Sequence, residues 1–254
     1  MMRRSTVTFL AMAALMPLAS AAAAFDPDTP LADPAKDSFP IRLGDQPDLT
    51  VRSAFFIGFG AAKRAGEDAV VVRDVGGTAY EFTPAALHVM DDGRAILLST
   101  GANPDASSAS SGINAIHYLR SSPSGWVRLG EWFDVGGTGT MGNAATSWAF
   151  TERLGKNPYL VSAGGGVWQG CLLNIAVITE MTPNGPVDRG SFTAAMSSGA
   201  GIGQDDAEYD GQIISAKPDH SFVVGYTGTK AQRQNYVLRD GKYQLVGRDH
   251  IPGC

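Results

Sequence analysis

The sequence predicts an all-β protein, and three observations carry that prediction. Short runs rich in Val, Ile, Leu, Phe and Tyr alternate with turns that contain Gly, Ser, Asn or Asp. No stretch of about 11 residues or more places its apolar residues at a helical period. A strand unit also recurs about every 60 residues along the chain. We therefore expect a propeller-like array of about four antiparallel units, with a β-sandwich as the alternative.

The chain begins with a segment that has the pattern of a secretory signal peptide. Within residues 1–24, two arginines precede an apolar run from Phe9 to Leu18, and small residues follow it up to Ala24. The apolar run is too short to cross a bilayer, so the pattern indicates a leader that is removed. We expect a soluble protein, periplasmic or secreted, that does not insert in a membrane.

The leader is followed by a stretch that is unsuited to regular structure. Residues 25–50 contain five prolines and six aspartates. Proline cannot donate to a sheet ladder or continue a helix, so this stretch predicts an extended arm or linker. Residues 51–254 are then expected to form a single all-β domain.

Twelve strands are predicted in this domain from the apolar runs between turn residues. In chain order they are Arg52–Gly58, Ala69–Arg73, Ala79–Phe82, Arg94–Thr100, Ile113–Leu119, Trp126–Phe133, Pro158–Ala163, Leu172–Glu180, Gln212–Ser215, Ser221–Tyr226, Asn235–Arg239 and Tyr243–Gly247.

The repetition has two parts. Four apolar runs each end in glycine, at Gly60, Gly101, Gly164 and Gly228, with spacings of 41, 63 and 64 residues. After the last three runs a hairpin follows, and these hairpins close at glycines 130, 190 and 247. The dipeptides Asn-Gly at 184–185 and Asp-Gly at 240–241 are typical of two-residue hairpin turns, because both turn positions need a positive φ.

The chain has two cysteines, Cys171 and Cys254. In an exported protein such a pair is most simply a disulfide. This bond would fasten the last residue back to the third repeat and help to close the array. A nucleophilic Cys171 is the alternative, but an exported thiol with a partner within reach is expected to be oxidised.

Two segments resemble the repeats of FG-GAP-type β-propellers, in which an acidic turn precedes a hydrophobic strand. They are Asp92–Leu98 and Asp206–Ile214. The resemblance implies a propeller architecture, and such turns often bind Ca²⁺. Oxygen ligands for a calcium ion are available within a few residues at Asp205, Asp206, Glu208 and Asp210. The alternative is that these acids form a solvated turn and that no cofactor is bound.

The charge of the chain narrows the class of partner. Removing the leader takes away two arginines and no acid, which moves the formal net charge from −5 to about −7. Nucleic acids and anionic lipids bind basic surfaces, so neither is expected as a partner of this acidic chain. An acidic protein suits a cationic partner, although acidity also serves solubility alone.

No familiar catalytic motif is present. The sequence contains no Gly-x-Ser-x-Gly, His-Glu-x-x-His, phosphate-binding glycine loop or Cys-x-x-Cys pattern. The four histidines, His88, His117, His220 and His250, are too far apart in sequence to form a metal-ligand motif. We expect structural roles for the first two and surface roles for the last two. A glycosidase would take its acids from distant strands, and no pair stands out.

Two glycine-rich segments form the best candidate for a ligand site. They are Gly136–Asn143 and Ala163–Gly170, and they include Asn143, Trp168 and Gln169. Glycine lets a ligand approach the backbone, while Trp, Gln and Asn suit a glycan or protein. The alternative is that the glycines serve turns and that Trp168 fills the core, as we expect of the other three tryptophans.

Together these observations predict an exported, non-catalytic binding protein of the cell envelope whose partner is a protein or glycan. A more specific hypothesis is an inhibitor or immunity factor for a basic enzyme that cleaves peptidoglycan. The alternatives are an envelope glycoside or cell-wall hydrolase with acids from several strands, and a calcium-dependent structural module.

Overall fold

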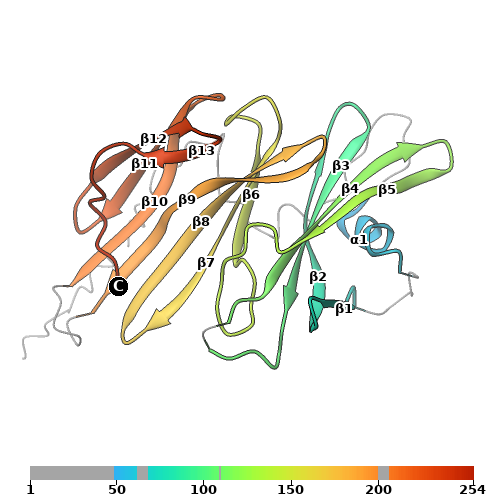
Figure 1. Ribbon diagram of the computed structural model, residues 1–254, viewed down its shortest axis with the longest axis horizontal. Helices are drawn as coiled ribbons and strands as arrows, with labels where there is room; N and C mark the ends of the chain where they lie inside the picture. The colour runs from blue at the N-terminus through green and yellow to red at the C-terminus, as the bar shows by residue number, and fades with distance from the viewer. Residues whose placement is uncertain (1–48, 62–67, 109, 200–205) are drawn as a thin grey trace, which may run out of the picture.

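A computed structural model describes residues 49–61, 68–108, 110–199 and 206–254 (Figure 1). Within these ranges the chain forms one short helix and thirteen strands in two antiparallel sheets. The predicted all-β class and the disulfide are confirmed. The predicted leader, most of the predicted arm, and Asp205 lie outside the described residues.

The first predicted strand is wrong, because residues Val51–Phe59 form the helix α1. Thr50 caps its N-terminus: the Ser53 amide donates to Thr50 Oγ1 at 3.1 Å, and the Thr50 amide donates to Ser53 Oγ at 2.9 Å. Gly60 ends the helix in the left-handed conformation, with φ of 62°. With only nine residues, the helix is too short for its apolar period to stand out.

The first sheet is a five-stranded meander in which each strand pairs with the next one in the chain. One of its faces is covered by α1, whose Phe55 and Phe59 pack with Phe82 and Leu97 of the sheet (Figure 1). The strands are β1 (Val71–Val75), β2 (Thr78–Val89), β3 (Arg94–Ala102), β4 (Ile113–Ser122) and β5 (Gly125–Phe133).

The second sheet has eight strands, also in chain order. The sequence patterns did not predict β6 and most of β9: β6 has only five residues, and β9 is rich in Ser, Thr, Ala and Gly. The strands are β6 (Ser147–Thr151), β7 (Tyr159–Trp168), β8 (Cys171–Thr182), β9 (Gly185–Ser198), β10 (Ala207–Lys217), β11 (Ser221–Gly228), β12 (Gln232–Arg239) and β13 (Lys242–Leu245).

The second sheet curls so that its last strand returns to β9. β9 pairs with β8 along its whole length, but with β10 only through residues 195–198. At the other end of β9, Arg189 Nη1 donates to the carbonyl of Gly241 at 2.7 Å, and Arg189 Nε donates to Glu180 Oε2 at 2.6 Å. A core that includes Phe192, Phe222 and Tyr236 lies within this curl.

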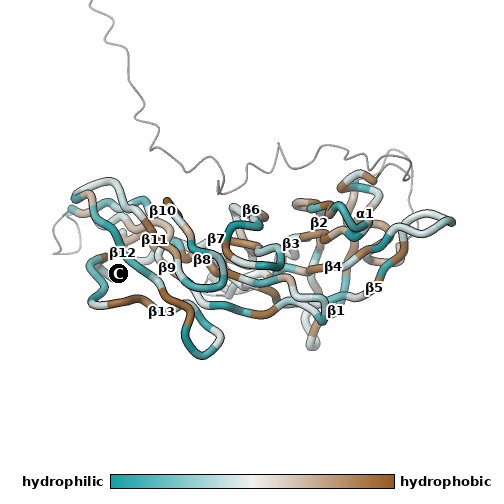
Figure 2. The backbone as a smooth tube through the Cα atoms, turned by 90° about the horizontal axis from the view of Figure 1, so that it is seen from above, coloured by the Kyte–Doolittle hydropathy of each residue, from teal (hydrophilic) through white to brown (hydrophobic). Residues whose placement is uncertain are grey.

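The two sheets lie side by side along the long axis of the molecule (Figure 2). A third core cluster joins them: Ile116 and Tyr118 of the first sheet pack with Trp148 and Leu160 of the second. Trp126 and Trp148 are buried and Trp132 is half-buried, so the first two confirm their predicted core positions.

The predicted repeats correspond to consecutive strands. The last three glycine-ended runs lie on β3, β7 and β11, and the hairpins that follow them are β4–β5, β8–β9 and β12–β13. The first run belongs to α1 and is not a strand. The repeats are thus antiparallel units, as expected, while their arrangement as a propeller stays a prediction.

Candidate functional site

The structure brings the two glycine-rich segments together. The loop of residues 136–143 lies along β7, where Ser162 Oγ donates to the carbonyl of Gly136 at 3.2 Å. Farther along the strand, Thr140 Oγ1 donates to the carbonyl of Gly165 at 3.0 Å. Segments that are about 25 residues apart in sequence therefore form one surface next to the end of the β7–β8 hairpin.

Two of the β7 glycines are needed for this contact. A Cβ atom at Gly166 would lie 2.6 Å from Thr140 Oγ1, and one at Gly164 would lie 3.0 Å from Thr138 Oγ1. Residues two apart on a strand share a face, so both glycines clear the same face for the loop. Trp168 is the next residue on that face, just beyond the region that the loop covers.

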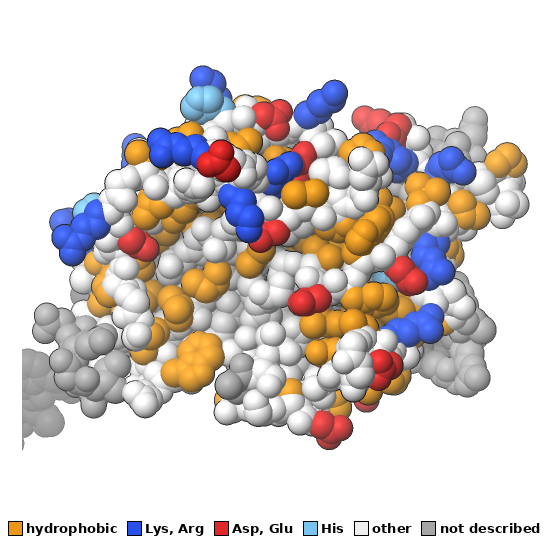
Figure 3. Space-filling model, viewed as in Figure 1, with side chains coloured by type: hydrophobic (Ala, Val, Ile, Leu, Met, Phe, Trp, Pro, Cys, Tyr) orange, Lys and Arg blue, Asp and Glu red, His pale blue; other side chains and the backbone are white. Residues whose placement is uncertain are grey.

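The end of the hairpin, which we call the hairpin tip (residues 167–170), is exposed. Trp168 is 43% exposed and Val167 is 62% exposed, while Gln169 and Gly170 form the turn with φ of 50° and 84°. Met141, which follows Thr140 in the adjoining loop, is 65% exposed. In Figure 3, hydrophobic side chains gather with polar ones at the lower left of this face, toward the end of this hairpin. Trp168 does not fill the core, so that alternative is wrong.

Asn143 braces the loop instead of joining Trp168 and Gln169. Its Nδ2 donates to the carbonyls of Thr140 and Met141 at 3.3 Å, and its own carbonyl accepts from the Gly112 amide at 2.7 Å. No hydrogen bond joins Asn143 to either residue of the tip in the described structure. Its role there is to hold the loop that covers β7.

The disulfide lies directly behind the hairpin tip. Cys171, which is buried, bonds to Cys254 with their Cα atoms 5.6 Å apart. The C-terminal segment before Cys254 is itself attached to β12, because Gln234 Nε2 donates to Asp249 Oδ1 at 2.6 Å. The hairpin tip is therefore fastened to the opposite end of its sheet.

The acids predicted as calcium ligands lie at the start of β10. The predicted acidic turn is wrong here, since Ala207–Lys217 is one strand, which places Glu208 and Asp210 on the same face. Burial and the charge of Glu208 raise the pKa of Asp210. Among the described residues, no group of three or more His, Cys, Asp or Glu side chains is placed to hold a metal ion. Calcium binding by Asp206, Glu208 and Asp210 stays a prediction.

His117 lies in a second cluster of charged groups, beneath α1. It is fully buried on β4, and its ring centroid lies 4.4 Å from that of Phe59. Its Nε2 is 3.7 Å from Glu131 Oε2, and neither ring nitrogen has a hydrogen-bond partner in the described residues. Glu131 instead binds Arg128, whose Nη1 also donates to the carbonyl of Gly58.

The electrostatics of this cluster favour neutral imidazole. Burial, followed by the positive charges of Arg128 and Arg73, lowers the pKa of His117 to about 4. Arg73 reaches the cluster because its Nη2 donates to the carbonyl of Phe59 at the end of α1. The other histidine near a carboxylate is His88, whose Nε2 lies 3.3 Å from Glu152 Oε1, and burial lowers its pKa too.

No protein-family model, curated protein or solved structure matches this chain significantly. No helix in the described ranges is long and apolar enough to span a membrane.

Proposed function

We propose that the protein is an exported, soluble, non-catalytic binding protein of the cell envelope that engages its partner through the hairpin tip. One observation carries the proposal: Trp168 and Val167 are exposed on opposite faces of a hairpin whose tip is fastened by the disulfide at Cys171. Exposed apolar side chains on a supported element mark interaction sites, and tryptophan is prominent among the residues that dominate binding energy.

The form of this surface suits insertion into a cleft. Both faces of the tip are open, so a partner that encloses it would bury Val167 and Trp168 together. The loop at Thr140 and the disulfide at Cys171 support the tip from two sides. A supported hairpin loses less conformational entropy on binding than a free one, which favours affinity.

The partner that fits best is a basic peptidoglycan-cleaving enzyme of the same compartment. The acidic chain would be attracted to such an enzyme, and a disulfide is compatible with an oxidising location outside the cytoplasm. An inhibitor or immunity factor would then occupy the substrate cleft of the enzyme with the hairpin tip.

The alternative of a cell-wall hydrolase requires two carboxylates that face one substrate cleft. A groove crosses β10, β11 and β12 and is lined by residues that include Gln212, Gly225 and Arg233, and none of its lining residues is a carboxylate. Elsewhere, the carboxylates of Glu131 and Glu180 are each bound to an arginine. These observations support binding over hydrolysis.

The proposal is tested by measuring peptidoglycan hydrolysis by purified basic lysozymes and lytic transglycosylases with increasing amounts of the mature protein. Stoichiometric inhibition of at least one enzyme, lost on Trp168→Ala, is the expected result. A pull-down from envelope extract, with the mature protein as one bait and its Trp168→Ala variant as the other, identifies the natural enzyme. Hydrolysis of cell-wall substrates by the protein alone would overturn the non-catalytic assignment.

A further inference from the structure

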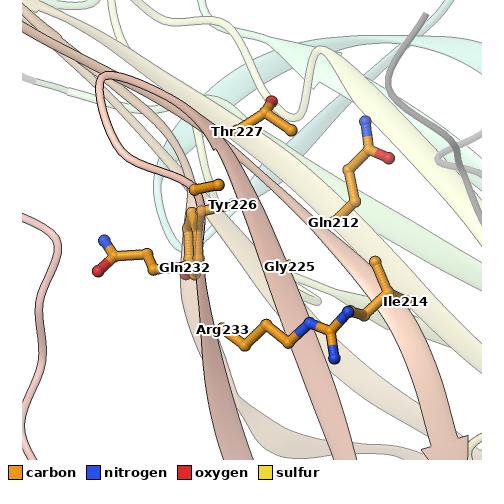
Figure 4. A pocket seen from close by; sticks show the side chains of 8 residues that line it. Gln212, Ile214, Gly225, Tyr226, Thr227, Gln232 and Arg233 are labelled. Carbon is orange, nitrogen blue, oxygen red and sulfur yellow. The ribbon is translucent and has the colours of Figure 1, made fainter.

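The groove over β10, β11 and β12 has a volume of about 580 Å³, and none of its lining residues belongs to the hairpin tip (Figure 4). The strand register creates it: Gln212 of β10 pairs with Gly225 of β11, which pairs with Arg233 of β12. Three residues from three strands thus stand in one row, and the central one has no side chain. A Cβ at Gly225 would lie 2.9 Å from the side chain of Ile214, which forms one wall.

Gln212 is the first sign that the groove is a binding site. Its side chain lines the groove although the residue is only 7% exposed. In the described part of the chain, its amide group forms no hydrogen bond with another residue. Its amide oxygen and nitrogen are therefore available as an acceptor and a donor to a ligand in the groove.

Arg233 provides the second sign. Its side chain extends across Gly225 toward Ile214, over the floor of the groove (Figure 4). Its guanidinium forms no ion pair or hydrogen bond with any described residue. A guanidinium offers paired donors that match the two oxygens of a carboxylate. Asp210 lies two residues from Gln212 on the same face of β10, where it pairs with Thr227, so the carboxylate and the guanidinium stand on different strands.

We propose that this groove binds a small ligand in which a carboxylate is attached to a compact hydrogen-bonding group. Arg233 takes the carboxylate, Gln212 pairs with an adjacent hydroxyl or amide, and Gly225 lets the ligand approach the backbone. A sugar acid and the C-terminus of a short peptide both have this chemistry. The proposal is independent of the hairpin tip and of the enzyme that the tip binds.

Isothermal titration calorimetry of the mature protein tests this with two pairs of probes. Glucuronate is compared with glucose, and acetyl-alanyl-alanine with its C-terminal amide, because the members of each pair differ at the carboxyl group. We expect at least one acid to bind at least tenfold more tightly than its neutral counterpart. A preference within only one pair identifies the source as sugar or peptide. If neither acid binds more tightly than its counterpart, the proposal is wrong.

Two variants place the binding in the groove. Arg233→Gln removes the cation and should weaken binding of the acid at least tenfold, and Gly225→Val should do the same by filling the floor. Arg239→Gln is the matched control, because it removes the same charge from the far end of β12, where Arg239 pairs with Lys242. An equal loss of affinity for the acid in the Arg233 and Arg239 variants would show that the ligand does not bind in the groove. Circular dichroism verifies that each variant is folded.

Discussion

Trp168 and Cys171 stand opposite each other as the last pair of the β7–β8 hairpin, so the disulfide to Cys254 begins directly behind the exposed indole. A buried, cross-linked residue and an exposed aromatic residue are thus direct cross-strand neighbours. This relationship joins covalent stability to the proposed binding surface. The effects on binding and on stability can be measured separately, because a substitution at Trp168 removes the indole and leaves the disulfide in place.

Trp168→Ala should weaken binding of the partner enzyme at least tenfold while leaving the free energy of unfolding within about 1 kcal/mol of the wild type, because the indole is 43% exposed. Inhibition assays and urea unfolding measure the two quantities. Leu129→Ala is the control, since Leu129 is 50% exposed on β5 of the other sheet. An equal loss of inhibition in both variants would contradict the role of the tip.

Replacing both cysteines by serine should lower the free energy of unfolding by about 2–5 kcal/mol, because the cross-link restricts the unfolded chain. The bond joins residues 83 positions apart. Urea unfolding of the wild type with reductant should match that of the double variant without it. If the double variant is as stable as the oxidised wild type, this expectation is wrong.

The stability of the protein should fall as the pH drops from about 6.5 to 4. Because folding holds the pKa of His117 near 4, the unfolded chain binds more protons than the folded one in this window. The contribution, about 3 kcal/mol, is complete above pH 6.5 and lost toward pH 4.

His117→Leu should reduce this dependence, measured as the urea midpoint at each pH, and the part that remains includes His88, whose pKa is also lowered by burial. The control His250→Gln changes an exposed histidine near the C-terminus and leaves His117 in place, so the dependence should persist. A wild-type curve that is flat between pH 4 and 6.5 would show that His117 is not held neutral.

Arg189→Leu should destabilise the fold by about 3–5 kcal/mol, because it leaves the Glu180 carboxylate buried without its cation. Glu180 is 7% exposed. Lys242→Ala is the matched control: it breaks the exposed ion pair with Asp188, which also joins β9 to the β12–β13 hairpin, and should cost less than about 1 kcal/mol. If thermal or urea unfolding shows that the two variants lose a similar free energy of unfolding, Arg189 has no special role.

Most strands could be predicted because each apolar run ends at a turn residue, as Ile96 to Gly101 does on β3. The helix α1 was mistaken for a strand since Phe55-Phe56-Ile57 is continuous and apolar. Its capping box has Ser53 in the position where Glu or Gln is the usual signal. The strands β6 and β9 went unpredicted because β6 is short and because Phe192 and Met196 of β9 stand among small and polar residues.

The candidate site was predictable in part. Glycine content indicated both segments that meet at Thr140 and Gly165, and neither segment alone shows that they touch. The exposure of Trp168 depends on where the covering loop ends, which is a tertiary property. The groove was missed because Gln212, Gly225 and Arg233 come together only through strand register, which the sequence does not display directly.

The short pairing between β9 and β10 makes this boundary of the second sheet weaker than the β8–β9 and β10–β11 boundaries on either side of it. Only residues 195–198 of β9 form that ladder, whereas β8 pairs with β9 from end to end. We therefore expect a partial opening to begin at this boundary, with β10–β13 moving away from β9 as a block and exposing the core that Phe192 shares with Phe222. The cross-link at Cys171 then acts as a tether, so the detached block stays at high local concentration and returns to its place faster than an untethered one would.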